Sequence, residues 1–308
     1  GGRFVGMELF EPEDLHVARA RCEELRPDAT RIPPNAASRA RDRMREASAA
    51  CDWPALRALV SDDFVFDERR KQSLLTGGVE LWIESMKQIR WAGAGYEWEL
   101  VATFGERIAL DRLALAGETP DGIRWEADVL RLTEVDAAGR IRASVSFDDD
   151  DRRAAFLEAH ARFAAGEAAA AGGQAPIEAL NRAYAASADD DWAGVRECLA
   201  DELMYNDRRT LGLGMFSRDQ WIESLRALYA LAPDMFVESF RILTWNRHGR
   251  VDVQRGYGTM PSGGGPFENV FIRVIVTAGD RIRHYELFDV GAVEPALARF
   301  EELCAAVR

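Results

Sequence analysis

The hydrophobic and polar positions of this chain follow a helical period first and a strand period afterwards. In the C-terminal half, residues 177–190 and 192–200 are expected to form two helices, and residues 219–229 place their apolar side chains on one stripe of a third. A short strand is expected at 202–209, between the second and third helices. Apolar and polar residues then alternate along four stretches, 236–246, 250–260, 267–277 and 281–289. Helices followed by an antiparallel meander predict an α+β fold, with helices packed on one face of a curved sheet.

This pattern occurs twice. Residues 52–87 align without a gap on residues 191–226, with 11 identities in 36 positions. One unit of about 135 residues is therefore expected in two copies. Residues 3–25 match residues 281–303, the end of the last unit, with 10 identities in 23 positions. We therefore expect the chain to open with the last strand and helix of a third copy, as in a fragment of a longer tandem array.

The repeat predicts the domain boundaries. Residues 1–34 would hold the strand and helix of the preceding copy and a linker, and residues 35–165 the first complete unit. A second linker at 166–175 and the second unit at 176–308 would follow. Both linkers combine Pro or Gly with small residues, which is typical of connecting segments. The strand at 3–10 would carry an open edge, able to pair with a second molecule.

Composition narrows the range of partners. The net charge is −13, which disfavours phosphate backbones and anionic lipid, so we expect neither nucleic acid nor membrane as a partner. The four cysteines are scattered without paired spacing, which suits a reducing cytoplasm. The four histidines likewise show no zinc spacing, and we expect neither metal nor cofactor. We find no apolar run of about 18 residues, the length needed to span a bilayer.

The unit resembles the NTF2-like superfamily, and particularly its SnoaL-like branch. The resemblance rests on the helices that come first, the acidic strand after the second helix and the ELFD ending of the last strand. The stretches DRRTLGLG at 207–214, LAPD at 231–234 and FEPEDLHVARARCEEL at 10–25 resemble tandem modules of actinobacterial multidomain regulators. The resemblance implies two consecutive NTF2-like cones, paired as an intramolecular pseudo-dimer or in a homo-oligomer. Because this fold hosts isomerases, cyclases, hydrolases and plain binding modules, it does not define a function.

In such a cone, the end of the first strand would line the pocket. The resemblance places a general-base carboxylate there, at Asp67 or Glu68 in the first unit and at Asp207 in the second. A carboxylate in an apolar pocket has a raised pKa and can move a proton next to a carbonyl. The alternative is that these acids only pair with the neighbouring arginines, among them Arg69 and Arg209.

A second candidate set lies on the last strand. His284, Glu286 and Phe288 share one face of that strand, and Glu268 lies on the strand before it. A His beside a Glu is a competent acid–base pair, so these residues could project into one pocket. Because the first unit has Ala143 and Val145 at the matching positions, such catalysis would belong to the second unit alone. The alternative is a polar wall that orients a ligand, or a core histidine.

Further side chains are candidates for ligand contact. Glu126 and Asp128 share a face of one strand of the first unit, as a general-acid arrangement or as a solvated surface. Trp82 and Trp221 occupy equivalent helix positions, and their presence in both copies favours core packing over ligand stacking. The complete set of expected ligand-binding residues is Asp67, Arg69, Trp82, Glu126, Asp128, Arg209, Trp221, Tyr257 and Phe288.

Two functions follow from these features. One is a small-molecule-binding or assembly module of a larger regulatory protein, with apolar pockets in the cones and a small apolar ligand. The other is a SnoaL-like, cofactor-independent isomerase, cyclase or hydrolase that acts on a polyketide- or steroid-like substrate. Its acid–base groups would be Asp207, His284, Glu286 and Glu268. Because the polar positions differ between the two copies, the sequence favours binding.

Overall fold

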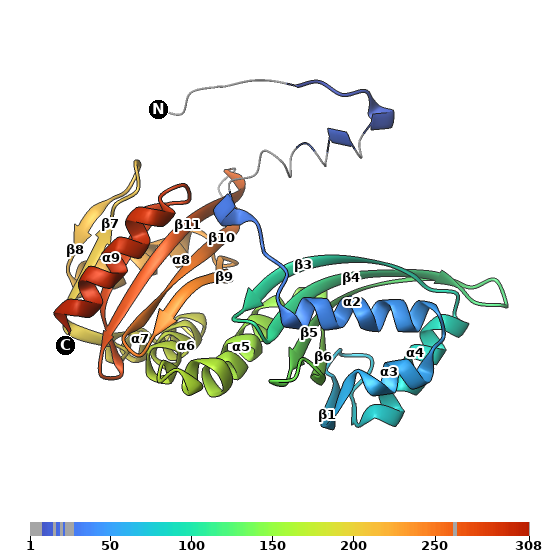
Figure 1. Ribbon diagram of the computed structural model, residues 1–308. Coiled ribbons are helices and arrows are strands. Elements are labelled where there is room, and N and C mark those ends of the chain that lie inside the picture. Colours follow the sequence, from blue (N-terminus) through green and yellow to red (C-terminus); the bar gives the residue numbers. More distant parts are fainter. Residues whose placement is uncertain (1–7, 15–16, 19–20, 22–27, 261–263, 308) are drawn as a thin grey trace.

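A computed structural model of the protein describes residues 8–14, 17–18, 21, 28–260 and 264–307. The predicted α+β class is confirmed, since each unit has its helices first and its sheet afterwards (Figure 1). The first unit contains α2 (Ala36–Ala49), α3 (Trp53–Ala58), β1 (Val60–Glu68), β2 (Leu75–Gly77), α4 (Val79–Trp91), β3 (Gly95–Phe104), β4 (Ile108–Glu118), β5 (Arg124–Val135), β6 (Ile141–Asp148) and α5 (Arg152–Phe163). The second contains α6 (Gln174–Ala188), α7 (Trp192–Glu197), β7 (Leu199–Asp207), β8 (Gly214–Phe216), α8 (Arg218–Leu231), β9 (Phe236–Asn246), β10 (Gly249–Met260), β11 (Gly265–Ala278), β12 (Arg281–Asp289) and α9 (Val293–Ala306).

The described strands form one sheet in the order β2-β1-β6-β5-β4-β3-β9-β10-β11-β12-β7-β8. Each unit contributes one half with the same internal order, and the halves meet at a short parallel contact between Thr103 and Arg241. The two units lie side by side about this contact (Figure 1). Strand register fixes which residues of the two halves are equivalent. Asp111 lies opposite Arg131 in the first half, and Asp252 lies opposite Arg273 in the second.

Local chemistry repeats with the fold. An aspartate caps each of the short helices α3 and α7, Asp52 in the first unit and Asp191 in the second. Its side chain accepts a hydrogen bond from the backbone N–H three residues further along the chain. The residue before each cap, Cys51 or Asp190, has a positive φ of 56° or 55°. The tight turn before each of these helices therefore has the same backbone conformation although the residues differ, because the capping hydrogen bonds hold the backbone in place.

The core has three principal parts. Helices α2, α3 and α4 pack on one face of the first half-sheet around Trp82. Helices α6, α7 and α8 pack in the same way on the second half-sheet around Trp221. The opposite faces of both half-sheets share one apolar cluster with α5 and α9, in which Phe156 and Phe300 take part. The helix that ends the first unit thus also packs against the second unit.

One expectation about the connections changes. The stretch expected to be a linker at 166–175 is largely helical, because α5 continues through a π-helical turn at Ala164–Ala168 and α6 begins at Gln174. Its alanines favour helix, and Ala168 is fully buried, so the segment packs as part of the structure. The strand expected at 3–10 lies mostly outside the described residues.

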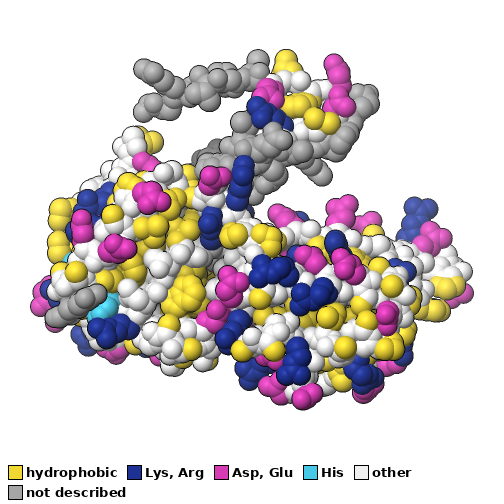
Figure 2. Space-filling model, in the orientation of Figure 1, with side chains coloured by type: hydrophobic (Ala, Val, Ile, Leu, Met, Phe, Trp, Pro, Cys, Tyr) yellow, Lys and Arg dark blue, Asp and Glu magenta, His cyan; other side chains and the backbone are white. Residues whose placement is uncertain are grey.

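Among the described residues, no helix is both long and apolar enough to cross a membrane. In the same part of the chain, no three His, Cys, Asp or Glu side chains gather in a way that could hold a metal ion. Charged side chains of both signs are interspersed over the face of the molecule in Figure 2.

Candidate functional site

The second unit encloses a cavity of about 270 Å³ between its helices and its half-sheet. Among the aromatic side chains that line it are Tyr205 of β7, Trp221 of α8 and Tyr285 of β12. The Tyr205 ring centroid lies 5.8 Å from that of Trp221 and 5.6 Å from that of Tyr285, in stacked arrangements. The rings therefore form a continuous aromatic wall inside the cone.

A small residue makes room for this cavity. Gly256 of β10 lines the cavity, whereas its register equivalent in the first unit is Leu115. Leu115 is buried and belongs to an apolar cluster against which Trp98 packs, and the residue equivalent to Trp98 is Ser239. The first unit thus fills with side chains the region that stays open in the second.

Asp207, expected as a general base, lies at the end of β7 and lines the cavity. Its carboxylate accepts hydrogen bonds from Nε and Nη2 of Arg209, at 2.8 and 2.7 Å, and from the backbone N–H of Leu213 at 3.3 Å. Burial favours the neutral acid, but the Arg209 guanidinium outweighs it and holds the pKa of Asp207 below its ordinary value. The carboxylate is therefore ionised, well satisfied and a weak base.

A buried arginine forms another part of the wall. Arg273 of β11 donates to both carboxylate oxygens of Asp252, at 3.1 and 2.7 Å, and to the hydroxyl of Tyr184 on α6. Its guanidinium lies over the rings of Tyr184 and Tyr285, with distances of 5.4 and 5.6 Å to their centroids. Burial raises the pKa of Tyr184 to about 12, so its hydroxyl stays protonated. The wall of the cavity thus contains a fully buried cation that lies over two aromatic rings.

The sequence did not single out Arg273, Asp252 or Tyr184. A signal was present, because an aspartate on one strand and an arginine on the next interrupt the apolar alternation in both units. Charged residues at the centre of strands that are otherwise apolar are expected to pair across the sheet.

The expected placement of His284 and Glu286 in the cavity is wrong. Beyond the register shift that follows Ile282, Tyr285 and Leu287 are the β12 residues that line it, so His284, Glu286 and Phe288 face the other way. Phe288 packs in the cluster with α9, and the Glu286 carboxylate accepts from Arg208 at 2.6 Å and Arg299 of α9 at 2.9 Å. Burial, followed by the charge of Arg283, lowers the pKa of His284, so the ring is neutral near pH 7. 

Glu268 is exposed on β11 and lines a different hollow, between the two units, together with Tyr257. The four acid–base candidates Asp207, His284, Glu286 and Glu268 therefore do not converge on one cavity. The reason is that helix α9 covers the face of β12 that carries the polar pair.

The first-unit candidates also lie apart. Asp67 pairs with Arg69 at 2.7 Å, and Arg69 reaches on to Glu158 of α5, so both belong to a network at the end of β1. Trp82 is fully buried and packs on Phe64 with ring centroids 5.0 Å apart. 

Glu126 and Asp128 are exposed on β5, where Asp128 pairs with Arg112 at 3.4 Å. Of the residues expected to contact a ligand, Arg209 and Trp221 are those that line the cavity of the second cone.

No protein-family model and no curated protein sequence matches the chain. Solved structures do resemble it. RV0760c from Mycobacterium tuberculosis, in complex with estradiol-17β-hemisuccinate, is 20% identical over 38% of this chain and 96% of its own, with a TM-score of 0.34. The Δ5-3-ketosteroid isomerase from Mycobacterium sp. is 16% identical over 38% and 95%, with a TM-score of 0.32. A putative polyketide cyclase from Xanthomonas campestris pv. campestris is 14% identical over 38% and 93%, with a TM-score of 0.31.

The fold class of the chain is α+β, with two consecutive units that each pack helices on a half-sheet, as the sequence predicts. Each of the three similar chains is matched over nearly its full length by little more than a third of this one.

Proposed function

We propose that the second unit binds a small, flat, apolar molecule inside its cone, and that the chain is a ligand-binding module of a larger regulatory protein. The observation that supports this most strongly is the cavity of about 270 Å³ walled by Tyr205, Trp221 and Tyr285. Its size is close to the lower end of small-molecule pockets, about 300 Å³. Stacked aromatic side chains are well suited to a planar ring system.

The polar groups of the wall favour binding over chemistry. Asp207 and Arg209 neutralise one another, and Arg273 is held in the buried wall by Asp252, which Arg250 also contacts. A ligand oxygen near Arg209, whose side chain is 20% exposed, could accept a hydrogen bond from a guanidinium that Asp207 already holds in place, which orients the ligand without an ordering cost. We therefore expect a neutral ligand with a carbonyl or phenol oxygen at one end.

The test is a fluorescence titration with Nile red, a neutral planar dye, on the wild type and on Gly256→Leu. Leucine copies Leu115 of the first unit, and a Cβ at Gly256 would meet its neighbours only at ordinary contact distances of 3.6 Å or more. The variant should fold and lose at least about tenfold in affinity, since the side chain occupies the ligand's place. Gly95→Leu, on an exposed part of β3, is the matched control and should bind as the wild type does. Equal binding by Gly256→Leu would refute the cone as the binding site.

A second candidate is the cofactor-independent acid–base enzyme. It is favoured by one observation, that the Asp207 carboxylate lines the cavity. A Δ5-3-ketosteroid and a polyketide-like ketone should be incubated with the wild type and with Asp207→Asn, and product followed by ultraviolet absorbance. Turnover that disappears in Asp207→Asn would establish the enzyme. Binding without turnover in the wild type would support the binding module.

A further inference from the structure

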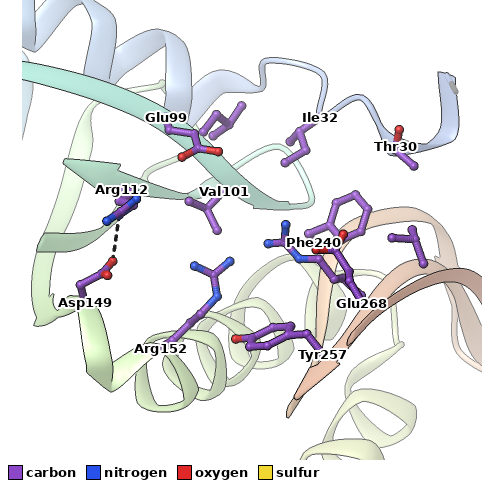
Figure 3. A pocket seen from close by; sticks show the side chains of 13 residues that line it. Thr30, Ile32, Glu99, Val101, Arg112, Asp149, Arg152, Phe240, Tyr257 and Glu268 are labelled. Carbon is purple, nitrogen blue, oxygen red and sulfur yellow. Dashed lines mark hydrogen bonds and ion pairs between the residues drawn. The ribbon is translucent and has the colours of Figure 1, made fainter. Parts of the chain in front are cut away.

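A second hollow, of about 590 Å³, lies between the two units. It opens where β3 and β4 of the first unit diverge from β10 and β11 of the second, on the sheet faces opposite to the cones (Figure 3). The start of α5 contributes Arg152, and the segment before α2 contributes Thr30 and Ile32. Both units and the segment that precedes them therefore build this interunit cleft.

One buried carboxylate holds two arginines at the cleft. The Glu238 side chain is fully buried and accepts a hydrogen bond from Nη2 of Arg152 at 2.8 Å and from Nε of Arg255 at 2.7 Å. Since one negative charge faces two guanidinium groups, one positive charge is left over. Both arginines line the cleft with part of their side chains exposed, 22% and 31%. The pair is therefore fixed in position and able to bind an anionic group.

The surroundings of this pair are partly apolar. Val101, Phe240 and Val270 line the cleft beside the arginines. The Tyr257 hydroxyl belongs to the same wall, and burial, followed by the charge of Glu238, raises its pKa to about 12, so it remains a hydrogen-bond donor. An anionic group and an apolar body would both find complementary surface here.

Acidic side chains limit the charge that the cleft accepts. Glu99 points toward Arg152 from the opposite wall (Figure 3), and Glu268 lies on β11. Both are exposed, and neither forms an ion pair with another described residue. The Arg112 charge is already opposed by Asp149 at 3.1 Å and by Asp128. The positive charge left over at Arg152 and Arg255 is therefore local, and Glu99 and Glu268 offset it over the cleft as a whole, so a ligand with several negative charges would be repelled.

We propose that the interunit cleft is a second binding site, separate from the cone cavity, for a small amphipathic molecule with one carboxylate. The carboxylate lies between Arg152 and Arg255, and the apolar body lies against Phe240, Val101 and Val270. A molecule bound in this way contacts both units at once.

The test is isothermal titration calorimetry with decanoate below its micellar concentration, with decanol as the uncharged control. Decanoate should saturate one site. Arg255→Gln should weaken the affinity for decanoate about tenfold or more, because the excess positive charge is lost. Glu238 keeps its contacts with Arg152 in this variant, and a thermal melt checks the fold. Decanol should bind equally weakly to both proteins. Gly256→Leu, which fills the cone, should leave decanoate binding unchanged.

Substitutions at two exposed residues test the proposal independently and should not affect folding. Glu99→Gln and Glu268→Gln each remove a repelling charge and should tighten decanoate binding by about two- to fivefold at low salt. Glu301→Gln, on the exposed side of α9, is the matched control and should have no effect. Absence of saturable binding to the wild type, or binding that Gly256→Leu abolishes while these variants leave it unchanged, would overturn the proposal.

Discussion

The Arg250 side chain on β10 donates a hydrogen bond to Nδ1 of His160 on α5, across 3.2 Å. This bond connects the last helix of the first unit to the sheet of the second. A guanidinium can only donate, so Nδ1 must accept and the imidazole is neutral. His160 is buried, and its ring meets the Phe104 ring edge-on, with centroids 4.7 Å apart. The contact between the units therefore contains a histidine that cannot gain a proton without losing its partner.

We predict that stability falls as the pH drops below about 6.5. Burial, followed by the charge of Arg250, holds the pKa of His160 well below 6.5, so the unfolded chain gains this proton before the folded one does. The contribution is fully present above the unfolded pKa and is lost as the pH falls toward the folded pKa, by at most about 1.4 kcal/mol per pH unit. Urea unfolding at pH 7.5, 6.5 and 5.5 measures it. 

His160→Gln keeps an acceptor for Arg250 and should remove most of the decline between pH 6.5 and 5.5. His284 has a lowered pKa as well and adds a decline of the same sign, which is why His284→Gln is the matched comparison. A decline that is undiminished in His160→Gln would contradict this assignment.

The two equivalent tryptophans should respond differently to truncation. Trp82 is fully buried in apolar packing, so Trp82→Ala should cost about 3–5 kcal/mol of unfolding free energy. Trp221 faces an existing cavity on one side, so Trp221→Ala should cost less and should abolish Nile red binding in the cone. Urea unfolding and dye titration of both variants test this pair. Equal stability losses with dye binding intact would show that Trp221 is only a core residue.

The fold could be predicted because its signals are local and occur twice. The alternation of apolar residues places the strands, and Asp52 and Asp191 mark the same helix start in both units. A period of two also shows that His284 and Glu286 share a face. It cannot show which face is inside, because α9 buries the second face of β12 and both faces then contain buried residues.

The cavity itself depends on contacts between distant parts of the chain. Tyr184, Asp252 and Arg273 come from a helix and two strands, and only the folded chain brings them together. The role of Gly256 becomes apparent only when it is compared with Leu115, its equivalent in the first unit. A comparison of the two copies strand by strand, in correct register, would have revealed the pairing of Asp252 with Arg273 and the change from Leu115 to Gly256, but not the contact with Tyr184.

Arg241 holds the segment that precedes the first unit by hydrogen bonds. Its Nη1 donates to the carbonyl oxygens of Asp28 and Arg31, at 2.7 and 3.0 Å, and of Ala29 at 3.3 Å. We predict that Arg241→Gln releases this segment, because an amide cannot reach all three acceptors. Hydrogen exchange of peptides that cover residues 28–34 should become at least about tenfold faster, while the unfolding free energy changes by no more than about 2 kcal/mol. Unchanged exchange would mean that other contacts hold the segment.

Asp111 and Asp252 occupy equivalent positions in the two half-sheets, but the pKa of Asp111 is raised and that of Asp252 is lowered. Arg273 and Arg250 both contact Asp252, and Ser239 donates to it at 2.9 Å. Burial opposes the charge of Asp252, but the two arginines outweigh it and lower its pKa. At Asp111 burial prevails over the contact with Arg41 and raises the pKa to about 7. Its second carboxylate oxygen has no hydrogen-bond partner among the described residues.

Asparagine at these two positions should therefore have unequal effects. Asp252→Asn leaves two fully buried arginines without their countercharge, so we expect it to cost about 3–5 kcal/mol at pH 7. Asp111→Asn replaces a group that is already partly protonated at pH 7, so the change should be within about 1 kcal/mol. A folded pKa of about 7, raised above the unfolded value of about 4, means that the wild type loses stability as the pH rises between these two values, which Asp111→Asn cannot do. The variant should therefore gain on the wild type between pH 5 and 7.5 in urea unfolding. If both substitutions cost the same at pH 7, the two carboxylates are equally ionised, and the difference in their surroundings has no energetic effect.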